Sequence, residues 1–141
     1  MPERLISADP EGFYFREHRG REHFAEEALA EYLRVIRDPT TVHAMCEDYR
    51  AGATFDFALD EEDRGRRLIQ CPVLVLWGSK GEVAKWYDVL GVWRDWANDV
   101  RGAPIESGHF LAEEAPGPTY EALQTFFDQI PVRSSALKGP A

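Results

Sequence analysis

An unbroken apolar run, Val73–Trp77, is the sequence feature that most constrains how this chain folds. The run follows Cys71-Pro72 and stops at Gly78, which gives it the length and the borders of a β-strand. A continuous apolar strand is typical of a parallel sheet covered on both faces, in which it has a neighbour on each side. Only a weaker pattern at 100–105 offers a second strand. The sequence therefore predicts an incomplete α/β fold, with further strands upstream of Met1 or in a second polypeptide.

Helical patterns lie on both sides of the predicted strand. Asp9-Pro10 and Asp38-Pro39 each combine a capping carboxylate with a first-turn proline, so both predict the start of a helix. Apolar residues recur with helical spacing over residues 25–36, and Trp86–Ala97 predicts one strongly amphipathic helix. The last helix is expected to pack through a shared apolar face formed by Tyr120, Leu123, Phe127 and Ile130.

These patterns divide the chain into two parts that are joined around residues 56–70. Residues 1–58 are expected to form a helical segment, residues 59–130 a strand–helix part, and residues 131–141 a flexible tail. The charged run 60–67 is interpreted most simply as a solvated connection, with one helical turn as the alternative.

The acidic balance of the chain limits its partners. Sixteen lysines and arginines against 25 aspartates and glutamates give a formal net charge of −9, which disfavours nucleic acid and anionic membrane surfaces but not a small anionic substrate. There is no signal peptide and no apolar run of about 18 residues. Two cysteines, Cys46 and Cys71, are too few for a disulfide framework and are expected to be packed side chains. We therefore expect a cytoplasmic protein.

Residues 103–116 carry the candidate chemistry. His109 follows the second predicted strand, and Gly108 before it permits a sharp turn of the backbone. An imidazole in such a loop suits a general base, because its pKa lies close to neutral pH. His18 and His23 suggest a metal site, but without further ligands they are interpreted as solvated loop side chains. No metal or organic cofactor is predicted.

Four segments of the chain resemble the fluoroacetate (haloacetate) dehalogenases of the α/β-hydrolase fold. They are residues 2–10, 43–52, 75–78 and 103–110. The resemblance extends over residues 2–130 and implies part of a helical cap followed by the last two core strands and helices. It also implies that Met1 lies inside the family's sequence, so we expect an N-terminal half to be missing.

The resemblance implies a mechanism for a small haloacid substrate. In that family an aspartate displaces halide from carbon, and a histidine-activated water hydrolyses the resulting ester. His109 matches this base, and Tyr49 matches the cap tyrosine that donates its phenol to the departing halide. The alternative for Tyr49 is a core residue, because it shares a helical face with Val42, Met45 and Cys46.

The sequence also departs from the family's pattern. The nucleophile, the arginines for the substrate carboxylate and the acid that orients the histidine all match positions upstream of Met1. Residues 78–81 lack the aspartate that many α/β-hydrolases carry after this strand, which agrees with the dehalogenases. Segment 14–24 is shorter than its counterpart. The alternatives are an epoxide hydrolase or other α/β-hydrolase fragment, or a non-catalytic fragment that forms homo-oligomers through its sheet edge.

Overall fold

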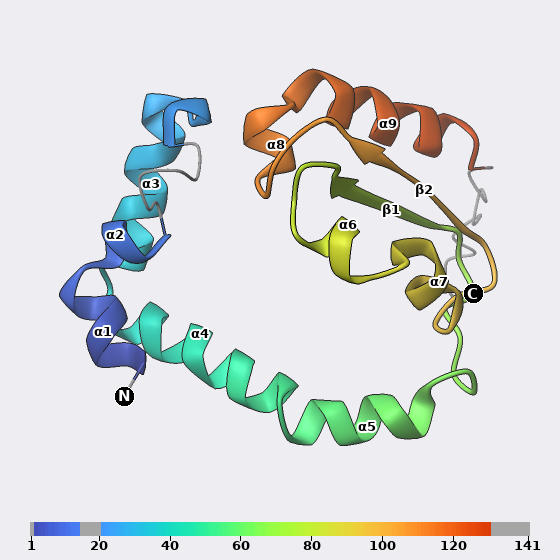
Figure 1. Cartoon of the computed structure of the whole chain (residues 1–141), viewed down its shortest axis with the longest axis horizontal. Helices are drawn as coiled ribbons and strands as arrows, with labels where there is room; N and C mark the ends of the chain where they lie inside the picture. The colour runs from blue at the N-terminus through green and yellow to red at the C-terminus, as the bar shows by residue number, and fades with distance from the viewer. Residues whose placement is uncertain (1, 15–20, 131–141) are drawn as a thin grey trace, which may run out of the picture.

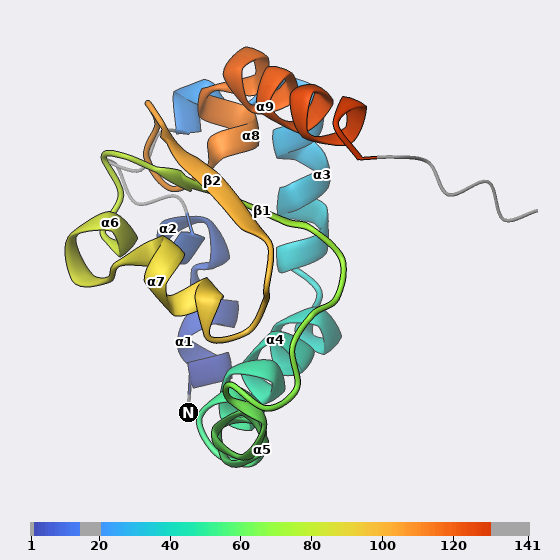
Figure 2. The same cartoon turned by 90° about the vertical axis from the view of Figure 1, so that its right-hand side faces the viewer.

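The two predicted strands pair at the centre of one half of the molecule. The computed structural model describes residues 2–14 and 21–130. Strands β1 (Val73–Gly78) and β2 (Val100–Ile105) run parallel along their whole length. The helices of this strand–helix half are α6 (Val83–Trp86), α7 (Val89–Arg94), α8 (Leu111–Glu114) and α9 (Pro116–Asp128). Helices α6 and α7 lie on one side of the strand pair and α8 and α9 on the other (Figures 1 and 2).

The described residues before β1 form a bent helical arm (Figure 1). Its elements are α1 (Pro2–Ala8), α2 (Pro10–Tyr14), the short 3-10 helix η1 (Arg21–His23), α3 (Glu26–Ile36), α4 (Pro39–Gly52) and α5 (Phe55–Asp63). A small core holds the arm together: Val42 and Cys46 of α4 are buried against Ile6 of α1. None of the helices that the structure describes is both long and apolar enough to cross a lipid bilayer.

Both aspartate–proline signals start helices as predicted. The Gly12 N–H donates to Asp9 Oδ1 at 2.9 Å at the start of α2, and the Thr40 N–H donates to Asp38 Oδ1 at 2.8 Å at the start of α4. Each carboxylate therefore satisfies a backbone donor that the first turn of a helix leaves unpaired.

The single helix predicted over 86–97 is wrong, because the chain forms α6 and α7 instead. Tyr87 between them is extended, with φ −134° and ψ 146°. Asp88 then caps α7 by accepting the Gly91 N–H at 3.1 Å. An apolar pattern with helical spacing did not reveal this break, because the capping aspartate lies on its polar side.

For the run 60–67 the structure agrees with the alternative of one helical turn, because residues 60–63 form the last turn of α5 after the strong helix formers Ala58 and Leu59. One further expectation is corrected. The apolar face predicted for α9 is also wrong, since Phe127 is 63% exposed whereas its neighbour Phe126 is 8% exposed. Adjacent faces of α9 are both apolar, so spacing alone did not decide which one packs on the sheet.

Strand β1 is only partly buried. Val75 and Gly78 are buried, whereas the other residues of the strand are half-buried. In the described ranges β1 pairs with β2 on one side only, and an apolar groove of about 400 Å³ runs along it beside α6 and α7. Cys46 is buried as expected, but Cys71 is exposed because it precedes this partly covered strand. The tail predicted at 131–141 lies outside the described residues.

Candidate functional site

His109 lies in the loop that joins β2 to α8. Its side chain is exposed, and its ring packs edge-on against Phe110 with 4.9 Å between the ring centroids. A hollow of about 570 Å³ opens beside it. Charged and polar side chains in its lining are Glu22, His23, Lys80, Glu82 and Glu114. The imidazole therefore faces a water-accessible, ionic environment in which it can exchange a proton.

The histidine loop crosses the end of β1 by backbone contacts. The Lys80 N–H donates to Ser107 O at 3.0 Å, and the Ser79 N–H donates to Ile105 O at 2.8 Å. A Cβ added to Gly78 would lie 1.8 Å from the carbonyl oxygen of Gly108. Only glycine therefore fits at position 78, where the apolar strand run ends.

Glu114 of α8 holds the histidine loop from the other side. The Gly108 N–H donates to its Oε2 at 2.5 Å, and the Phe110 N–H donates to its Oε1 at 2.9 Å. Burial raises the pKa of Glu114, but these two N–H groups and the nearby His23 and His109 lower it more, so its pKa lies below the ordinary value. The carboxylate thus stays ionised beside the imidazole.

Sequence reasoning did not identify Glu114. The available signal was a glutamate in the first turn of the helix that follows the glycine–histidine pair, as in the reciprocal bond of a capping box. That signal alone does not tell a helix cap from a residue that holds a functional loop.

Tyr49 lies on α4 and is 80% exposed, so the alternative that it is a core residue does not hold in this structure. Val42 and Cys46 form the buried face of the same helix. Helix α4 and the loop before α8 lie apart in both views (Figures 1 and 2). The described residues therefore do not bring Tyr49 to His109.

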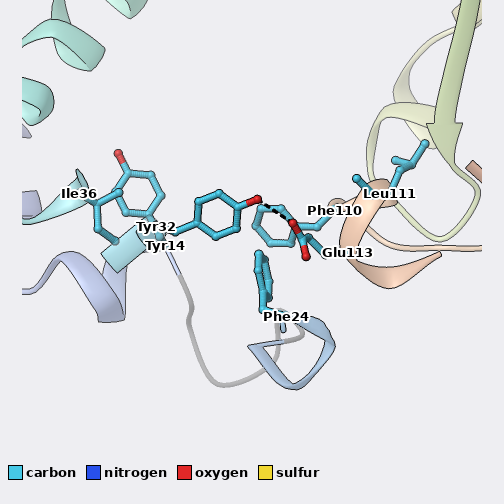
Figure 3. Close-up of a pocket in the computed structure, with 8 residues that line it drawn as sticks. Tyr14, Phe24, Tyr32, Ile36, Phe110, Leu111 and Glu113 are labelled. Atoms are coloured by element: carbon cyan, nitrogen blue, oxygen red, sulfur yellow. Dashed lines mark hydrogen bonds between the residues drawn. The ribbon is translucent and has the colours of Figure 1, made fainter. Parts of the chain in front are cut away.

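The helical arm meets the strand–helix half beside the histidine loop. Tyr32 OH of α3 donates to Glu113 Oε1 of α8 at 2.7 Å, and Phe24 packs edge-on against Phe110 at 5.1 Å between centroids. An apolar pocket of about 400 Å³ lies between these groups, as Figure 3 shows. The hydrogen bond and the negative charge of Glu113 raise the pKa of the Tyr32 phenol.

A second polar cluster lies between α1 and α4. Glu3, His43 and Glu47 offer ligand atoms that lie within 4.8 Å of one another. Arg50, however, is ion-paired with both Glu3 and Glu47, and its hydrogen bond is the main reason that the pKa of Glu3 falls to about 2. A guanidinium between the two carboxylates makes this an ion-pair network rather than a metal centre. Of the two histidines weighed as metal ligands from the sequence, His18 lies outside the described residues, and His23 is exposed beside Glu22.

Comparisons with known proteins show which protein family the chain belongs to. No protein-family model matches the chain. It is 39% identical over 130 residues to a fluoroacetate dehalogenase from Burkholderia sp, covering 89% of this chain and 42% of that protein. It is 30% identical over 105 residues to a soluble epoxide hydrolase from Corynebacterium sp., covering 74% of this chain and 35% of that protein. A solved structure from Nostoc sp PCC 7120, assigned as an α/β hydrolase, aligns with a TM-score of 0.83 and 47% identity over 92% of this chain and 46% of its own. The chain is an α/β-hydrolase homologue.

This α/β-hydrolase homologue spans less than half the length of the curated relatives it matches. The predicted resemblance and the partial α/β-hydrolase fold are both confirmed. The structure places His109 at the carboxyl end of β2, where ligands bind in open α/β sheets. None of the described residues that line the hollow beside His109 is an aspartate.

Proposed function

We propose that this hydrolase homologue is the cap-and-histidine part of an enzyme that removes halide from a haloacetate. The observation that carries the proposal is the position of His109, exposed beside an ionic hollow at the carboxyl end of β2. The 39% identity to a fluoroacetate dehalogenase supports the substrate class. A segment outside the present sequence supplies the nucleophile and the groups that bind the substrate carboxylate.

The reaction has two steps. An aspartate oxygen attacks the carbon that bears the halogen, so a carbon–oxygen bond forms, the carbon–halogen bond breaks and halide leaves. His109 then takes a proton from water, and the resulting hydroxide attacks the carbonyl of the ester. The ester carbon–oxygen bond then breaks, and His109 returns its proton to the departing oxygen of glycolate. The regenerated aspartic acid loses the remaining proton of the attacking water to solvent, which restores the carboxylate. No metal or organic cofactor takes part.

Tyr49 is the proposed donor to the departing halide. Its side chain on α4 is exposed, so the phenol is accessible to a substrate. The described residues leave it away from His109, so this assignment rests on the resemblance of residues 43–52 to the family rather than on the geometry. Fluoride is strongly hydrated, so a fixed hydrogen-bond donor that replaces its water lowers the barrier of the first step.

Fragment complementation tests the proposal. The chain is mixed with the N-terminal portion of the Burkholderia dehalogenase that it does not match, and fluoride release from fluoroacetate is measured. We expect turnover from the mixture and none from the chain alone, because a general base without a nucleophile has no ester to hydrolyse. His109→Asn in the mixture should stop turnover and leave a covalent glycolyl ester on the partner's aspartate, detectable by mass spectrometry.

His43→Asn is the matched control, because His43 is an exposed histidine on α4 away from the loop. Turnover that survives His109→Asn, or that His43→Asn abolishes equally, would remove the proposed role of His109. Fluoride release by the chain alone that depends on His109 would show instead that the chain carries its own nucleophile.

The second candidate is an epoxide hydrolase, favoured by the 30% identity to the Corynebacterium enzyme. Such an enzyme would share the aspartate and the histidine-activated water, while Tyr49 would protonate the alkoxide of the opened ring. The same mixture should be offered a small epoxide. Diol formation without fluoride release would favour this candidate.

The working partner in either case is proposed to be the missing N-terminal half rather than a second copy of the chain. A second copy would repeat the residues already present and would not supply the portion of the dehalogenase that this chain does not match. Sedimentation of the chain at low concentration, with and without the N-terminal fragment, distinguishes the homo-oligomer from the heterodimer.

A further inference from the structure

We propose that Glu114 is a positioning residue that fixes the backbone on both sides of His109 and thereby sets the orientation of its imidazole. This inference rests on the proposed role of His109 as the base. Glu114 itself does not touch the reacting atoms in this proposal. It acts through the loop that carries the histidine.

The hydrogen bonds of Glu114 enclose His109. One carboxylate oxygen accepts the N–H of Gly108 at 2.5 Å and the other accepts the N–H of Phe110 at 2.9 Å. The residues immediately before and after the histidine are therefore held by one rigid planar group. Two anchors two residues apart restrict the backbone torsions of the residue between them, and charge-assisted bonds of this kind are stronger than neutral ones.

The space around the loop leaves little room for another arrangement. A Cβ on Gly108 would lie 2.8 Å from Glu114 Oε2 on one side of the loop. On the other side, the Gly108 carbonyl oxygen lies so close to Gly78 that a Cβ there would be 1.8 Å away. The histidine loop is therefore wedged between the end of β1 and the first turn of α8.

The charge of Glu114 adds a second effect on the imidazole. The carboxylate is ionised at neutral pH and interacts electrostatically with His109 and His23. A nearby negative charge stabilises the imidazolium that forms when the base accepts a proton. The other charged groups that line the hollow are Glu22, Lys80 and Glu82, and they remain in place in every variant used below.

The test measures the loop in the full chain by NMR, before and after Glu114→Gln and Glu114→Ala. In the alanine variant, amide exchange at Gly108 and Phe110 should speed up by about tenfold or more, because both amides lose a charged acceptor. Glu114→Gln should give a smaller loss of protection, because the amide retains one acceptor oxygen.

Glu113→Gln is the control, because this neighbouring carboxylate bonds Tyr32 and not the histidine loop. It should not change the exchange of the two amides. The proposal is overturned if both Glu114 variants leave that exchange unchanged, if Glu113→Gln speeds it up equally, or if exchange speeds up uniformly over the chain, which indicates a merely structural role. If the Glu114→Ala variant does not fold, amide exchange in the Glu114→Gln variant tests the proposal.

Failure of the proposed function gives a different result. In the complementation mixture, Glu114→Gln should lower kcat more than it raises KM if His109 is the base. If His109→Asn leaves turnover unchanged while the exchange of the loop amides still responds to Glu114, the proposed role of His109 as base is wrong and the anchoring role of Glu114 stands. If His109→Asn stops turnover and Glu114→Gln does not lower kcat, the positioning role is wrong.

Discussion

Tyr32 on α3 donates a hydrogen bond to Glu113 on α8 across 2.7 Å, and this bond joins the helical arm to the strand–helix half. The residue that follows Glu113 is the one that holds the histidine loop. A contact of the arm and a contact of the candidate base therefore come from consecutive residues of one short helix.

Replacing Tyr32 with phenylalanine should loosen the arm without unfolding the chain. The phenol is exposed, so losing its hydrogen bond should lower the free energy of unfolding only slightly. Proton contacts between the rings of Phe24 and Phe110, measured by NMR, should weaken or disappear. Tyr120→Phe on the exposed face of α9 is the control and should leave them intact. Unchanged ring contacts in both variants would show that aromatic packing alone holds the arm.

Gly78→Ala should destabilise the chain by about 3 kcal/mol, because its Cβ would meet the Gly108 carbonyl and neither backbone can move without breaking the strand or the loop. Urea denaturation followed by tryptophan fluorescence measures the change. The control is Gly117→Ala, since a Cβ at that helical position meets nothing within 4 Å. It should alter stability by less than about 1 kcal/mol. Equal effects of the two substitutions would contradict the crossing of loop and strand.

The ion pair between Glu3 and Arg50 predicts a pH dependence. The pKa of Glu3 falls to about 2, chiefly through its hydrogen bond from Arg50. A carboxyl whose pKa is lowered on folding contributes stability above its unfolded pKa, and the contribution is lost as pH falls through the folded value. The melting temperature of Glu3→Gln should therefore lie below that of the original chain at neutral pH and approach it near pH 2. A difference independent of pH would point to packing instead.

Tyr49→Phe in the complementation mixture should slow defluorination by about a hundredfold, which corresponds to about 3 kcal/mol of transition-state stabilisation. No ester should accumulate, because the first step is the one affected. The rate of chloroacetate turnover should fall less, because chloride leaves more readily and needs less help from a hydrogen-bond donor. Equal slowing of both substrates would count against a halide donor.

The apolar groove along β1 should make the chain bind a hydrophobic dye or form oligomers on its own. Adding the N-terminal fragment should reduce dye fluorescence as it covers the strand. Val83→Lys places a charge in the lining of the groove and should weaken dye binding. Gel filtration that gives a monomer without dye binding would contradict the interpretation that β1 lacks a neighbour.

Sequence patterns predicted the elements whose signals are local. The run at 73–77 became β1, and the carboxylates of Asp9 and Asp38 cap helices where expected. Features that depend on packing between elements distant in the sequence were not predicted. The aromatic residues of α9 occupy two adjacent faces, and only packing on the sheet decides that Phe126 is buried.

The candidate site was predictable in part for the same reason. His109 stands out through a local glycine–histidine pair in a loop. Glu114 acquires its role because the loop before α8 brings the amides on both sides of the histidine to its carboxylate. Sequence spacing shows only a glutamate in the first turn of a helix, which does not distinguish a helix cap from a residue that holds a functional loop.

The crossing of the histidine loop over β1 is made by main-chain atoms, with hydrogen bonds to carbonyl oxygens of Ile105 and Ser107. Its geometry depends on few side chains: position 78 must be glycine, and Glu114 holds the amides on both sides of the histidine. Substitutions in the arm away from Phe24 and Tyr32 can therefore accumulate while the histidine keeps its place. Under the proposed function, such changes would alter which substrate enters and leave the base as it is.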